Sequence, residues 1–300
     1  MIVFQQKICP NPVLALGVFD GVHAGHRHIV ATACRLAERI GGSCVAVTFD
    51  PHPRQIVADG SPELLLPLTE RKRLLVEAGA AQVATIAFDA GVSRLSPEEF
   101  CLRLQSETGC RGIVTGEHWR FGSGGKGDRL SLERFASPRG IAVESPRELE
   151  LNGVVISSSA IRSLIAQGEL ATAREMLGRD IGVYGQVIHG YRDAGSLLDA
   201  PTANLQVEYG VLPPDGVYAG RAVVDGVPHT AVANLGFSPT FDRGDADRRL
   251  EIHLLDGSGD LYGKNIRFDF VKFLRRERRF ASVEELKRQI KSDIEEARGI

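Results

Sequence analysis

Two histidines three residues apart, His23 and His26, carry side chains that could take part in chemistry. They stand in the stretch GVFDGVHAGH, residues 17–26, just past an apolar run and among three glycines. Imidazole rings can donate hydrogen bonds to phosphate oxygens as charge develops on them in a transition state. A zinc site would need a third protein ligand, and no nearby Cys or His stands at a metal-like spacing. The pair therefore favours phosphate binding, with a structural or capping role as the first alternative and metal binding as the second.

A second candidate anion site is the stretch ISSSAIRSLI, residues 156–165, in which a serine run precedes a helical pattern. Arg162 falls in the first turns of that helix. Serine is a common N-cap in any helix, so the stretch alone indicates a capped helix rather than a binding site. Together with the histidine turn, the serines and the arginine indicate a second group of residues that binds the opposite end of a triphosphate.

Two loops separate the histidines from the serine run: TFDPHPRQ at residues 48–55 and TGEHWRFGSGGKGD at residues 115–128. The first is a strand that ends in a rigid turn, on the side where open α/β sheets bind ligands. The second holds an aromatic pair and one lysine. A flexible surface linker is the alternative interpretation of this second loop.

The elements that must position these residues change in style along the chain. From Val13 to about Leu177, short apolar runs alternate with amphipathic segments, which is typical of a parallel sheet covered on both faces. After EMLGRD, short segments rich in Val, Ile, Tyr and Phe alternate with turn signals, and one helical pattern, SVEELKRQIKSDIEEAR, ends the chain. The sequence therefore predicts an α/β domain at 1–180 and, at 181–300, a small antiparallel barrel or sandwich with a C-terminal helix.

Within the first domain, the histidine pair lies where a strand is expected to meet a helix. We expect a buried strand at 14–19 and a helix at 27–40 that the glycine pair at 41–42 closes. A helix N-terminus offers unpaired backbone N–H groups and a partial positive charge, and glycines let the backbone approach a ligand closely. An anion is the ligand that such a turn favours.

Length and composition limit the function classes. The 300 residues suffice for two domains, and 36 basic against 38 acidic residues give no footprint for nucleic acid or an acidic membrane. No window approaches the roughly 20 apolar residues that span a bilayer, and the N-terminus does not read as a signal peptide, so we expect a cytoplasmic protein. The cysteines are scattered without a Cys-x-x-Cys, which disfavours a disulfide framework and a cysteine zinc site. They are Cys9, Cys34, Cys44, Cys101 and Cys110.

Four motifs of the first domain follow one another in the order GVFDGVHAGH, TFDPHP, WRFG…KGD and ISSSAIR. The second domain adds PTANL, DGVYAG, ANLGFSPTF and LEIHLLDGSGDLYGK. With both sets present, the chain resembles the bacterial bifunctional riboflavin kinase/FMN adenylyltransferases, the FAD synthetases. The resemblance covers nearly the whole chain. It implies a doubly wound, Rossmann-like nucleotidyltransferase domain of parallel strands, followed by a riboflavin kinase β-barrel.

The resemblance implies that the first domain joins FMN to the AMP part of ATP and releases pyrophosphate. His23 and His26 would hold the ATP phosphates, and Ser158 and Arg162 would steady the leaving pyrophosphate. The phosphate of FMN is already an adequate nucleophile, so the protein has mainly to align the attack and offset charge, with Mg²⁺ accompanying the triphosphate. The expected nucleotide and flavin contacts are Gly17, Phe19, Asp20, Gly21, Gly25, His52, Phe121, Lys126, Asp128 and Ser157.

For the second domain, the resemblance implies phosphorylation of the ribityl 5′-hydroxyl of riboflavin. Thr202 and Asn204 of the PTAN motif would bind Mg²⁺ and nucleotide phosphate, and Glu251 would be the general base. A carboxylate within hydrogen-bond reach suits this transfer, because the alcohol must lose a proton as phosphorus is attacked. On the residues alone, Glu251 reads as a solvated residue of a half-exposed strand.

The loop after WRFG departs from the family pattern. Gly125 stands where family members carry an arginine or another basic residue, which leaves Lys126 as the nearby cation. The predicted FMN contacts of this loop rest on that lysine.

The larger departure precedes PTAN. Family members usually carry a glycine-rich, basic loop there, whereas residues 189–201 read HGYRDAGSLLDAP. Asp199 would repel a phosphate, Ser196 lies where a cation would help, and Ala200 replaces the bulky residue before Pro201. We therefore expect the kinase step to be weak or absent. In the alternative, Asp199 points to solvent or joins the Mg²⁺ shell.

FMN adenylylation is the activity that the sequence supports best, with riboflavin kinase as the second activity of a bifunctional enzyme. One alternative is a monofunctional adenylyltransferase whose kinase-like domain remains as a scaffold or flavin-binding module. A non-catalytic flavin-binding or regulatory protein is the alternative of a different class. The intact GVFDGVHAGH and ISSSAIR motifs disfavour it. The oligomeric state stays open.

Overall fold

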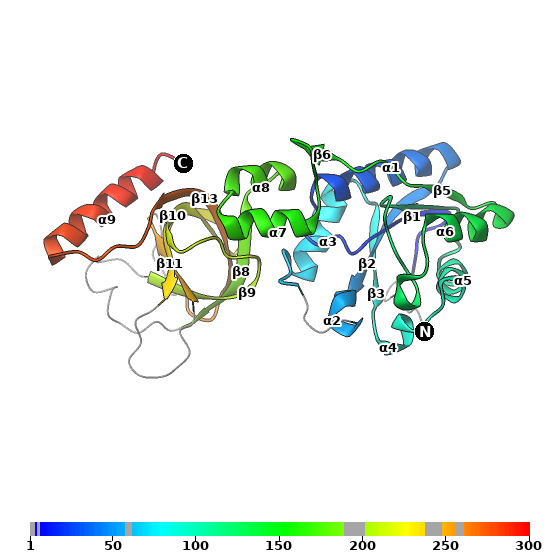
Figure 1. The fold of residues 1–300 in the computed structure, drawn as a ribbon, viewed down its shortest axis with the longest axis horizontal. Helices are drawn as coiled ribbons and strands as arrows, with labels where there is room; N and C mark the ends of the chain where they lie inside the picture. The colour runs from blue at the N-terminus through cyan, green and yellow to red at the C-terminus, as the bar shows by residue number, and fades with distance from the viewer. Residues whose placement is uncertain (1–3, 5–6, 58–61, 189–201, 238–247, 256–260) are drawn as a thin grey trace. The chain divides into compact units, whose positions relative to one another are not determined.

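The computed structural model describes residues 4, 7–57, 62–188, 202–237, 248–255 and 261–300. The chain forms two compact units (Figure 1). One contains Met1–Glu63 and Pro67–Ala160, and the other contains Leu64–Leu66 and Ile161–Ile300.

The first unit is built on a sheet of five parallel strands in the order β3-β2-β1-β4-β5. The strands are β1 (Pro12–Leu16), β2 (Ser43–Asp50), β3 (Gln82–Ala87), β4 (Gly112–Thr115) and β5 (Ala142–Glu144). The chain runs from β1 outward to β3, returns to β4 beside β1, and continues to β5. This is a doubly wound sheet, as predicted, and its strand order reverses between β1 and β4.

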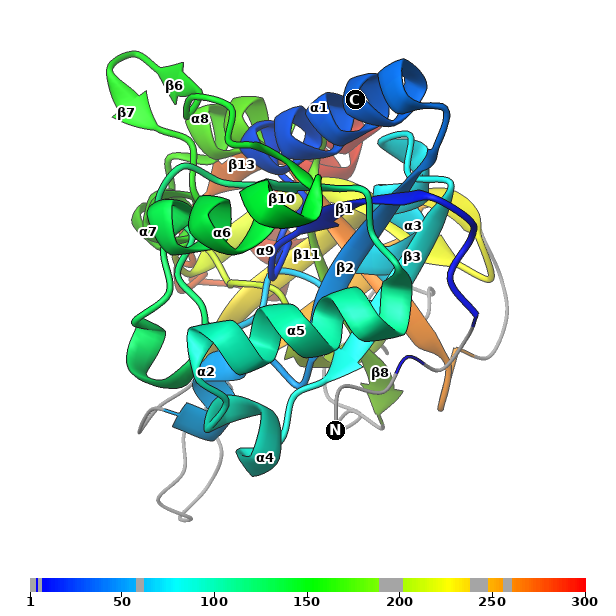
Figure 2. The ribbon, with the colours of Figure 1, turned by 90° about the vertical axis from the view of Figure 1, so that its right-hand side faces the viewer.

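Helices cover both faces of this sheet, because its strands are apolar on both sides. Helices α1 (Ala24–Ile40) and α3 (Leu68–Glu77) pack on one face, and α5 (Pro97–Thr108) and α6 (Arg129–Ala136) pack on the other. Figure 2 shows α1 and α5 on opposite sides of the strands. Short elements complete the unit: α2 (Pro53–Val57), α4 (Ala90–Ser93), η1 (Ser123–Gly125), η2 (Ser137–Arg139), β6 (Glu150–Leu151) and β7 (Val154–Val155).

Helix α1 begins at Ala24, three residues before the predicted start, and β1 ends at Leu16 rather than near residue 19. The helix extends further back because His23 caps it: its Nδ1 accepts a hydrogen bond from the backbone N–H of His26. A histidine cap carries no sequence signal comparable to Ser or Asp. The predicted end of the helix is confirmed by Gly41, which adopts φ +64° and donates to the last turn.

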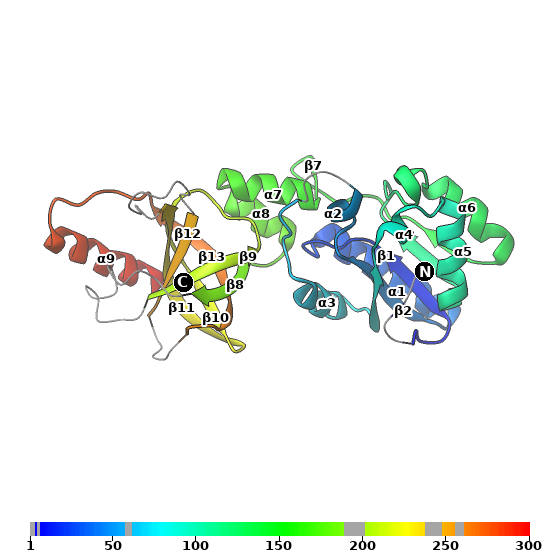
Figure 3. The same ribbon diagram turned by 90° about the horizontal axis from the view of Figure 1, so that it is seen from below.

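In the second unit, helices α7 (Ser158–Gln167, which begins in the first unit) and α8 (Leu170–Leu177) precede a closed antiparallel barrel. The strand order is β10-β11-β12-β9-β8-β13 (Figure 3). The strands are β8 (Ile181–Ile188), β9 (Thr202–Tyr209), β10 (Gly216–Val224), β11 (Val227–Phe237), β12 (Arg248–Leu254) and β13 (Asn265–Arg275). The structure therefore decides for the barrel and against the sandwich.

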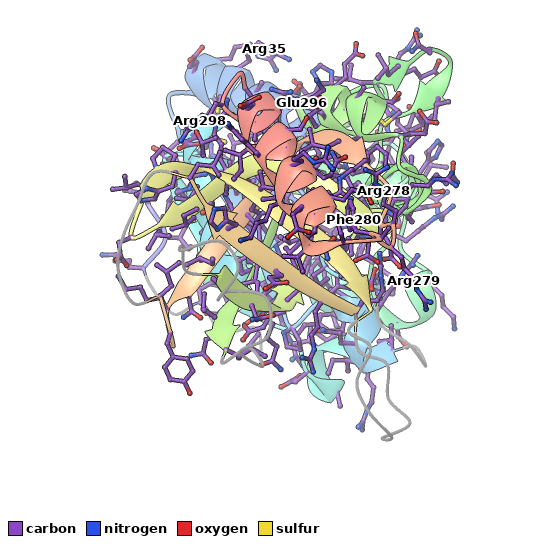
Figure 4. The ribbon with its side chains drawn as sticks, turned by 90° about the vertical axis from the view of Figure 1, so that its left-hand side faces the viewer. Arg35, Arg278, Arg279, Phe280, Glu296 and Arg298 are labelled. Atoms are coloured by element: carbon purple, nitrogen blue, oxygen red, sulfur yellow. The ribbon has the colours of Figure 1, made fainter. Side chains whose placement is uncertain are left out.

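The C-terminal helix α9 (Val283–Ala297) lies across the outside of this barrel (Figure 4). Ser282 caps it by accepting from the backbone N–H of Glu285. An ion pair ties the helix to the end of β13, with Arg275 Nη2 2.8 Å from the buried carboxylate of Asp293.

A three-residue segment from the first half of the chain, Leu64–Leu66, packs in the second unit. The backbone N–H of Gly210 donates to the carbonyl of Leu64 at 2.8 Å, and Leu65 and Leu66 are buried. Gly210 has φ +103°, and a Cβ there would lie 2.7 Å from Val183 Cγ1, so only glycine fits this close approach.

Candidate functional site

The first candidate site lies at the point where the strand order of the parallel sheet reverses. The chain leaves the neighbouring strands β1 and β4 in opposite directions, and in open α/β sheets ligands bind outside the carboxyl ends of the strands at such a point. The histidine turn follows β1, and the loop at residues 115–128 follows β4. Two of the stretches singled out in the sequence therefore meet at the edge where such sheets bind ligands.

The two histidine rings stack on each other at the N-terminus of α1. Their centroids are 3.6 Å apart and their planes differ by 22°, while Phe19 meets the ring of His26 edge-on at 5.3 Å. His23 is only 4% exposed, and its Nδ1 accepts from the N–H of His26 at 3.4 Å. Because Nδ1 is the acceptor, the neutral ring of His23 carries its proton on Nε2 and can donate from there.

The turn before these rings has a strained backbone. Phe19, Gly21 and Val22 adopt φ values of +56°, +88° and +39°, a region that residues with a Cβ seldom occupy. Such a conformation persists only where its surroundings hold it, and it is frequent at functional sites. Two carbonyls of the turn receive side-chain donors: Asp20 O accepts from Ser158 Oγ at 2.7 Å, and Val22 O accepts from Arg27 Nη1 at 3.1 Å.

The glycines of this stretch let side chains pack closely against the turn. A Cβ at Gly25 would lie 3.2 Å from the ring of His23 and 3.3 Å from the carbonyl of Ile156. At Gly17, a Cβ would lie 2.9 Å from the ring of Phe19. These two predicted contact residues therefore leave room for the protein's own rings and backbone.

Ser157 and Ser158 of the serine run have different contacts. Ser157 Oγ accepts from the backbone N–H of Ala160, which is the capping interaction considered for this stretch. Ser158 Oγ donates a hydrogen bond to Asp20 O and so joins helix α7 to the histidine turn. Arg162 lies one turn further along α7, on the same helix face as Ser158.

The residues predicted to contact the flavin lie in different surroundings. Phe121 is buried and stacks on Trp119 at 4.8 Å, so it belongs to the core of the first unit. Asp128 caps α6 by accepting a hydrogen bond from the backbone N–H of Ser131. This hydrogen bond lowers the pKa of the Asp128 carboxyl group. Lys126 is exposed. His52 accepts from the N–H of Arg54 through Nδ1 at 3.1 Å, beside the short helix α2.

The second candidate site lies on the outer face of the barrel. Along β12, Leu250, Ile252 and Leu254 are buried in the barrel, so Glu251 and His253 face outward. The strand register puts Glu251 directly opposite Asn204 of β9 and Asn234 of β11. The two predicted residues of this site, Asn204 and Glu251, are thus cross-strand neighbours.

Thr202, the other predicted residue, lies in register opposite His253. Its side chain lies outside the described part of the chain, as do Ser196, Asp199, Ala200 and Pro201.

Beside Glu251, a pocket of about 230 Å³ lies between the barrel and α9. Its apolar wall consists of Val217, Val232, Leu286, Ile290 and Ile294, and its polar lining includes Asn234, Glu251, His253, Arg275 and Glu277. Figure 4 shows Arg278 and Phe280 at the start of the α9 segment, where the guanidinium of Arg278 lies 4.9 Å from the ring centroid of Phe280. A pocket of this kind suits a largely apolar ring system whose polar tail reaches the carboxylate.

Sequence reasoning gave no role to Asn234 and Glu277. Asn234 Nδ2 donates to Glu277 Oε1 at 2.8 Å, and a Cβ at Gly236 would lie 2.5 Å from the same carboxylate. The glycine of the ANLG motif therefore makes room for Glu277 at the rim of the pocket. The ANLG motif was the available signal in the sequence, but Glu277, the residue that packs against Gly236, comes about 40 residues later.

No group of three or more His, Cys, Asp or Glu side chains in the described ranges is arranged to hold a metal ion. All five cysteines are free thiols, and three of them are buried. None of the helices that the structure describes is long and apolar enough to cross a membrane.

Comparison with known proteins assigns a family to each half. The FAD synthetase family model matches residues 5–160, and the riboflavin kinase model matches residues 177–300. The chain is 35% identical over 289 residues to the bifunctional riboflavin kinase/FMN adenylyltransferase of Pseudomonas fluorescens, covering 96% of this chain and 92% of that protein. It is 36% identical over 284 residues to the protein of the same description from Escherichia coli K12, covering 94% and 90%.

Among solved structures, a protein from Streptococcus pneumoniae described as a macrolide-efflux protein has the same fold over the whole chain. The TM-score is 0.84 at 28% identity, covering 100% of this chain and 96% of the other. The description as a macrolide-efflux protein refers to the Streptococcus pneumoniae protein alone.

Proposed function

Because the chain belongs to the bifunctional riboflavin kinase/FMN adenylyltransferases, we propose that its two units divide the two reactions between them. It is an enzyme of FAD biosynthesis whose substrates are ATP, FMN and riboflavin. The parallel sheet carries FMN adenylylation, and the barrel carries riboflavin phosphorylation. The observation that supports this division most directly is the stacked histidine pair at the helix N-terminus where the strand order reverses.

In adenylylation, an oxygen of the FMN phosphate attacks the α-phosphorus of ATP, and the bond to the β-phosphate breaks to release pyrophosphate. His23 and His26 donate to the phosphates, and the N-terminus of α1 adds a fixed partial positive charge. Arg162 supplies charge to the leaving pyrophosphate. Ser158 contributes mainly by holding the turn, since its hydroxyl already donates a hydrogen bond to Asp20 O.

The remaining predicted contacts line the same edge of the sheet in supporting roles. Phe121 and Asp128 stabilise the loop at residues 115–128 from within, while the exposed Lys126 is the cation that can meet the phosphate of FMN. His52, at the end of the loop after β2, lies at the same carboxyl edge. Because each of the cysteines is a free thiol, a reducing compartment such as the cytoplasm suits the protein.

In phosphorylation, the pocket beside α9 binds the isoalloxazine ring, and the ribityl chain reaches Glu251. The carboxylate of Glu251 accepts the proton of the 5′-hydroxyl as that oxygen attacks the γ-phosphorus of ATP, and the bond from the γ-phosphorus to the bridging oxygen breaks to release ADP. Asn204, directly opposite on β9, orients the phosphate at the same place.

Mg²⁺ fits the oxygen donors predicted for the kinase site. The amide oxygen of Asn204 and the hydroxyl of Thr202 are hard ligands, and Mg²⁺ is usually held by few protein groups together with substrate phosphates. When bound, the ion offsets phosphate charge.

Product analysis tests the assignment. Purified protein given riboflavin and Mg-ATP should form FMN and then FAD, and protein given FMN and Mg-ATP should form FAD with an equal amount of pyrophosphate. Chromatography separates the flavins, and a coupled assay follows pyrophosphate. A protein that binds flavin but forms neither product would contradict the proposal.

The loop at residues 189–201 lies outside the described residues, and its predicted weakening of the kinase stays a prediction. A carboxylate about 5 Å from a phosphate oxygen costs roughly 1 kcal/mol in water and more in a site of lower dielectric. Asp199→Gly should therefore raise the riboflavin phosphorylation rate several-fold, and Asp199→Gly combined with Ser196→Arg should raise it further. A parent rate of about 1 s⁻¹ or faster, unchanged by both variants, would show that the loop is fully active as it stands.

We also propose that the functional boundary lies near residue 180. A fragment of residues 1–180 keeps the histidine turn, Ser158 and Arg162, so it should retain FMN adenylylation within about tenfold of the whole chain. A fragment of residues 181–300 lacks Leu65 and Leu66, each worth about 1.5–3 kcal/mol when buried, and should melt at a lower temperature than the barrel in the whole chain. Circular dichroism and the pyrophosphate assay measure both effects. An unfolded 1–180 fragment would contradict the boundary.

A further inference from the structure

Arg71 is the largest fully buried side chain of the described residues, with 2% of its surface exposed. It lies in the first turn of α3, where the helix dipole disfavours a positive charge. Removing a guanidinium from water is costly, and an apolar residue of similar volume would fill a core at least as well. Packing alone therefore does not explain an arginine at this position.

The contacts of Arg71 join the ends of two strands. Its Nη1 donates to Val18 O at 3.3 Å, to Thr48 Oγ1 at 3.3 Å and to Phe49 O at 3.2 Å. Val18 follows β1 and begins the histidine turn, whereas Thr48 and Phe49 are near the end of β2. One side chain thus fixes the distance between the carboxyl ends of two neighbouring strands.

Val18 O also accepts from the buried hydroxyl of Thr48 at 2.8 Å. Every second carbonyl of the turn, at Val18, Asp20 and Val22, therefore accepts a hydrogen bond from a side chain, and the first two of these donors come from distant segments. Val18 O is held from β2 and α3, Asp20 O from α7, and Val22 O from α1. The strained residues lie between and at these carbonyls, so the three attachments keep the backbone in its left-handed conformation.

We infer that Arg71 is a positioning residue for FMN adenylylation: it anchors the start of the strained turn and so sets where His23 and His26 stand. This inference rests on the proposed role of the histidine pair. It adds that the orientation of the two imidazole rings depends on the buried guanidinium of Arg71, which lies outside the family motifs. All of the hydrogen bonds named above lie within the first unit, so riboflavin phosphorylation in the same molecule serves as an internal control.

The test compares Arg71→Met, Arg71→Lys and the matched control Arg73→Met. Arg73 lies two residues further along α3, half-exposed, and pairs with Glu70 and Glu77 on the surface. In the whole chain, Arg71→Met should lower kcat for FMN adenylylation at least tenfold while riboflavin phosphorylation stays within twofold. Arg71→Lys, which keeps the charge and can still reach one carbonyl, should recover part of that loss. Arg73→Met should change neither reaction by more than twofold.

Should Arg71→Met fail to fold, Thr48→Val removes the other donor to Val18 O with little change in volume. Its kcat for adenylylation should fall in the same direction. Where Arg71→Met does fold, combining it with Thr48→Val should cost less than the product of the two single losses, because both side chains act on one carbonyl. An equal loss in both reactions, or a lower melting temperature with unchanged kcat, would overturn the inference.

Hydrogen exchange gives a readout that does not depend on activity. In Arg71→Met or Thr48→Val, amides of residues 18–27 should exchange faster, while those of α5 should not change. Unchanged exchange in the turn would overturn the inference. A parent protein that makes no FAD would instead contradict the proposed function, and exchange would still decide whether Arg71 holds the turn.

Discussion

Replacing His26 with alanine is expected to lower kcat/KM for FMN adenylylation about 10²-fold or more, because one donor to the charge that develops on the phosphates is lost. His23→Ala should have a smaller effect, since the ring of His23 also caps α1 and part of its loss will appear as stability. Both rings lie at the helix N-terminus, so the fold should survive His26→Ala. The pyrophosphate assay with varied ATP separates the effect on kcat from that on KM.

The matched control is His28→Ala, two residues further along α1 on another side of the helix. It removes an imidazole from the same helix without touching the stacked pair, and it should leave adenylylation within twofold. Riboflavin phosphorylation should be unchanged in all three variants. A His26→Ala protein that melts early but keeps the parent rate per folded molecule would show that the histidine is structural. Stoichiometric zinc in the purified parent would contradict phosphate binding by the pair.

Glu251→Gln is expected to lower kcat for riboflavin phosphorylation by about 10²–10⁴-fold, the range that general base catalysis contributes. The amide keeps the shape of the side chain and can still hydrogen-bond to a hydroxyl, but it cannot take up the proton. KM for riboflavin should therefore change little, since the apolar wall of the pocket is untouched. FMN adenylylation, measured in the same preparation, should remain at the parent rate.

Glu208→Gln provides the control, since this carboxylate is exposed on the neighbouring strand β9. It should leave both reactions unchanged. A Glu251→Gln protein with the parent kcat would restore the other interpretation of this residue, a solvated side chain on a half-exposed strand. A rise in KM with constant kcat would make Glu251 a binding residue rather than the base.

The architecture could be predicted because its signals are local. Alternating apolar runs and amphipathic segments indicated a parallel sheet covered on both faces, and the family resemblance added that it is doubly wound. Gly41 marked the end of α1 through its left-handed conformation. The histidine turn was found in the same way, from a motif whose residues are neighbours in sequence. The start of α1 was wrong by three residues, because the cap is a histidine that only the folded turn identifies as one.

The features that escaped prediction depend on contacts between distant segments. Arg71 stands in the charged stretch ERKR, whose pattern gives no sign that one arginine is buried under the ends of two strands. Phe121, a predicted flavin contact, stacks on Trp119 in the core, and its motif gives no sign of this packing. The pocket beside α9 needs the Arg275–Asp293 ion pair and the fit of Glu277 against Gly236. None of these pairings leaves a periodic trace in the sequence.

Leu64–Leu66 affects the order in which the protein can fold during synthesis. The hydrogen bond from Gly210 to Leu64 closes a loop of roughly 150 residues, whose chain entropy opposes closure by about 4 kcal/mol if the loop is unstructured. Prior folding of the first unit shortens that loop. At about 5–20 residues per second, about 7–30 s pass on the ribosome between the synthesis of Leu64 and that of its partner Gly210. Until the second unit has been made and has folded, the nascent chain exposes two adjacent leucines, Leu65 and Leu66, which makes this segment a point where chaperones or aggregation can act.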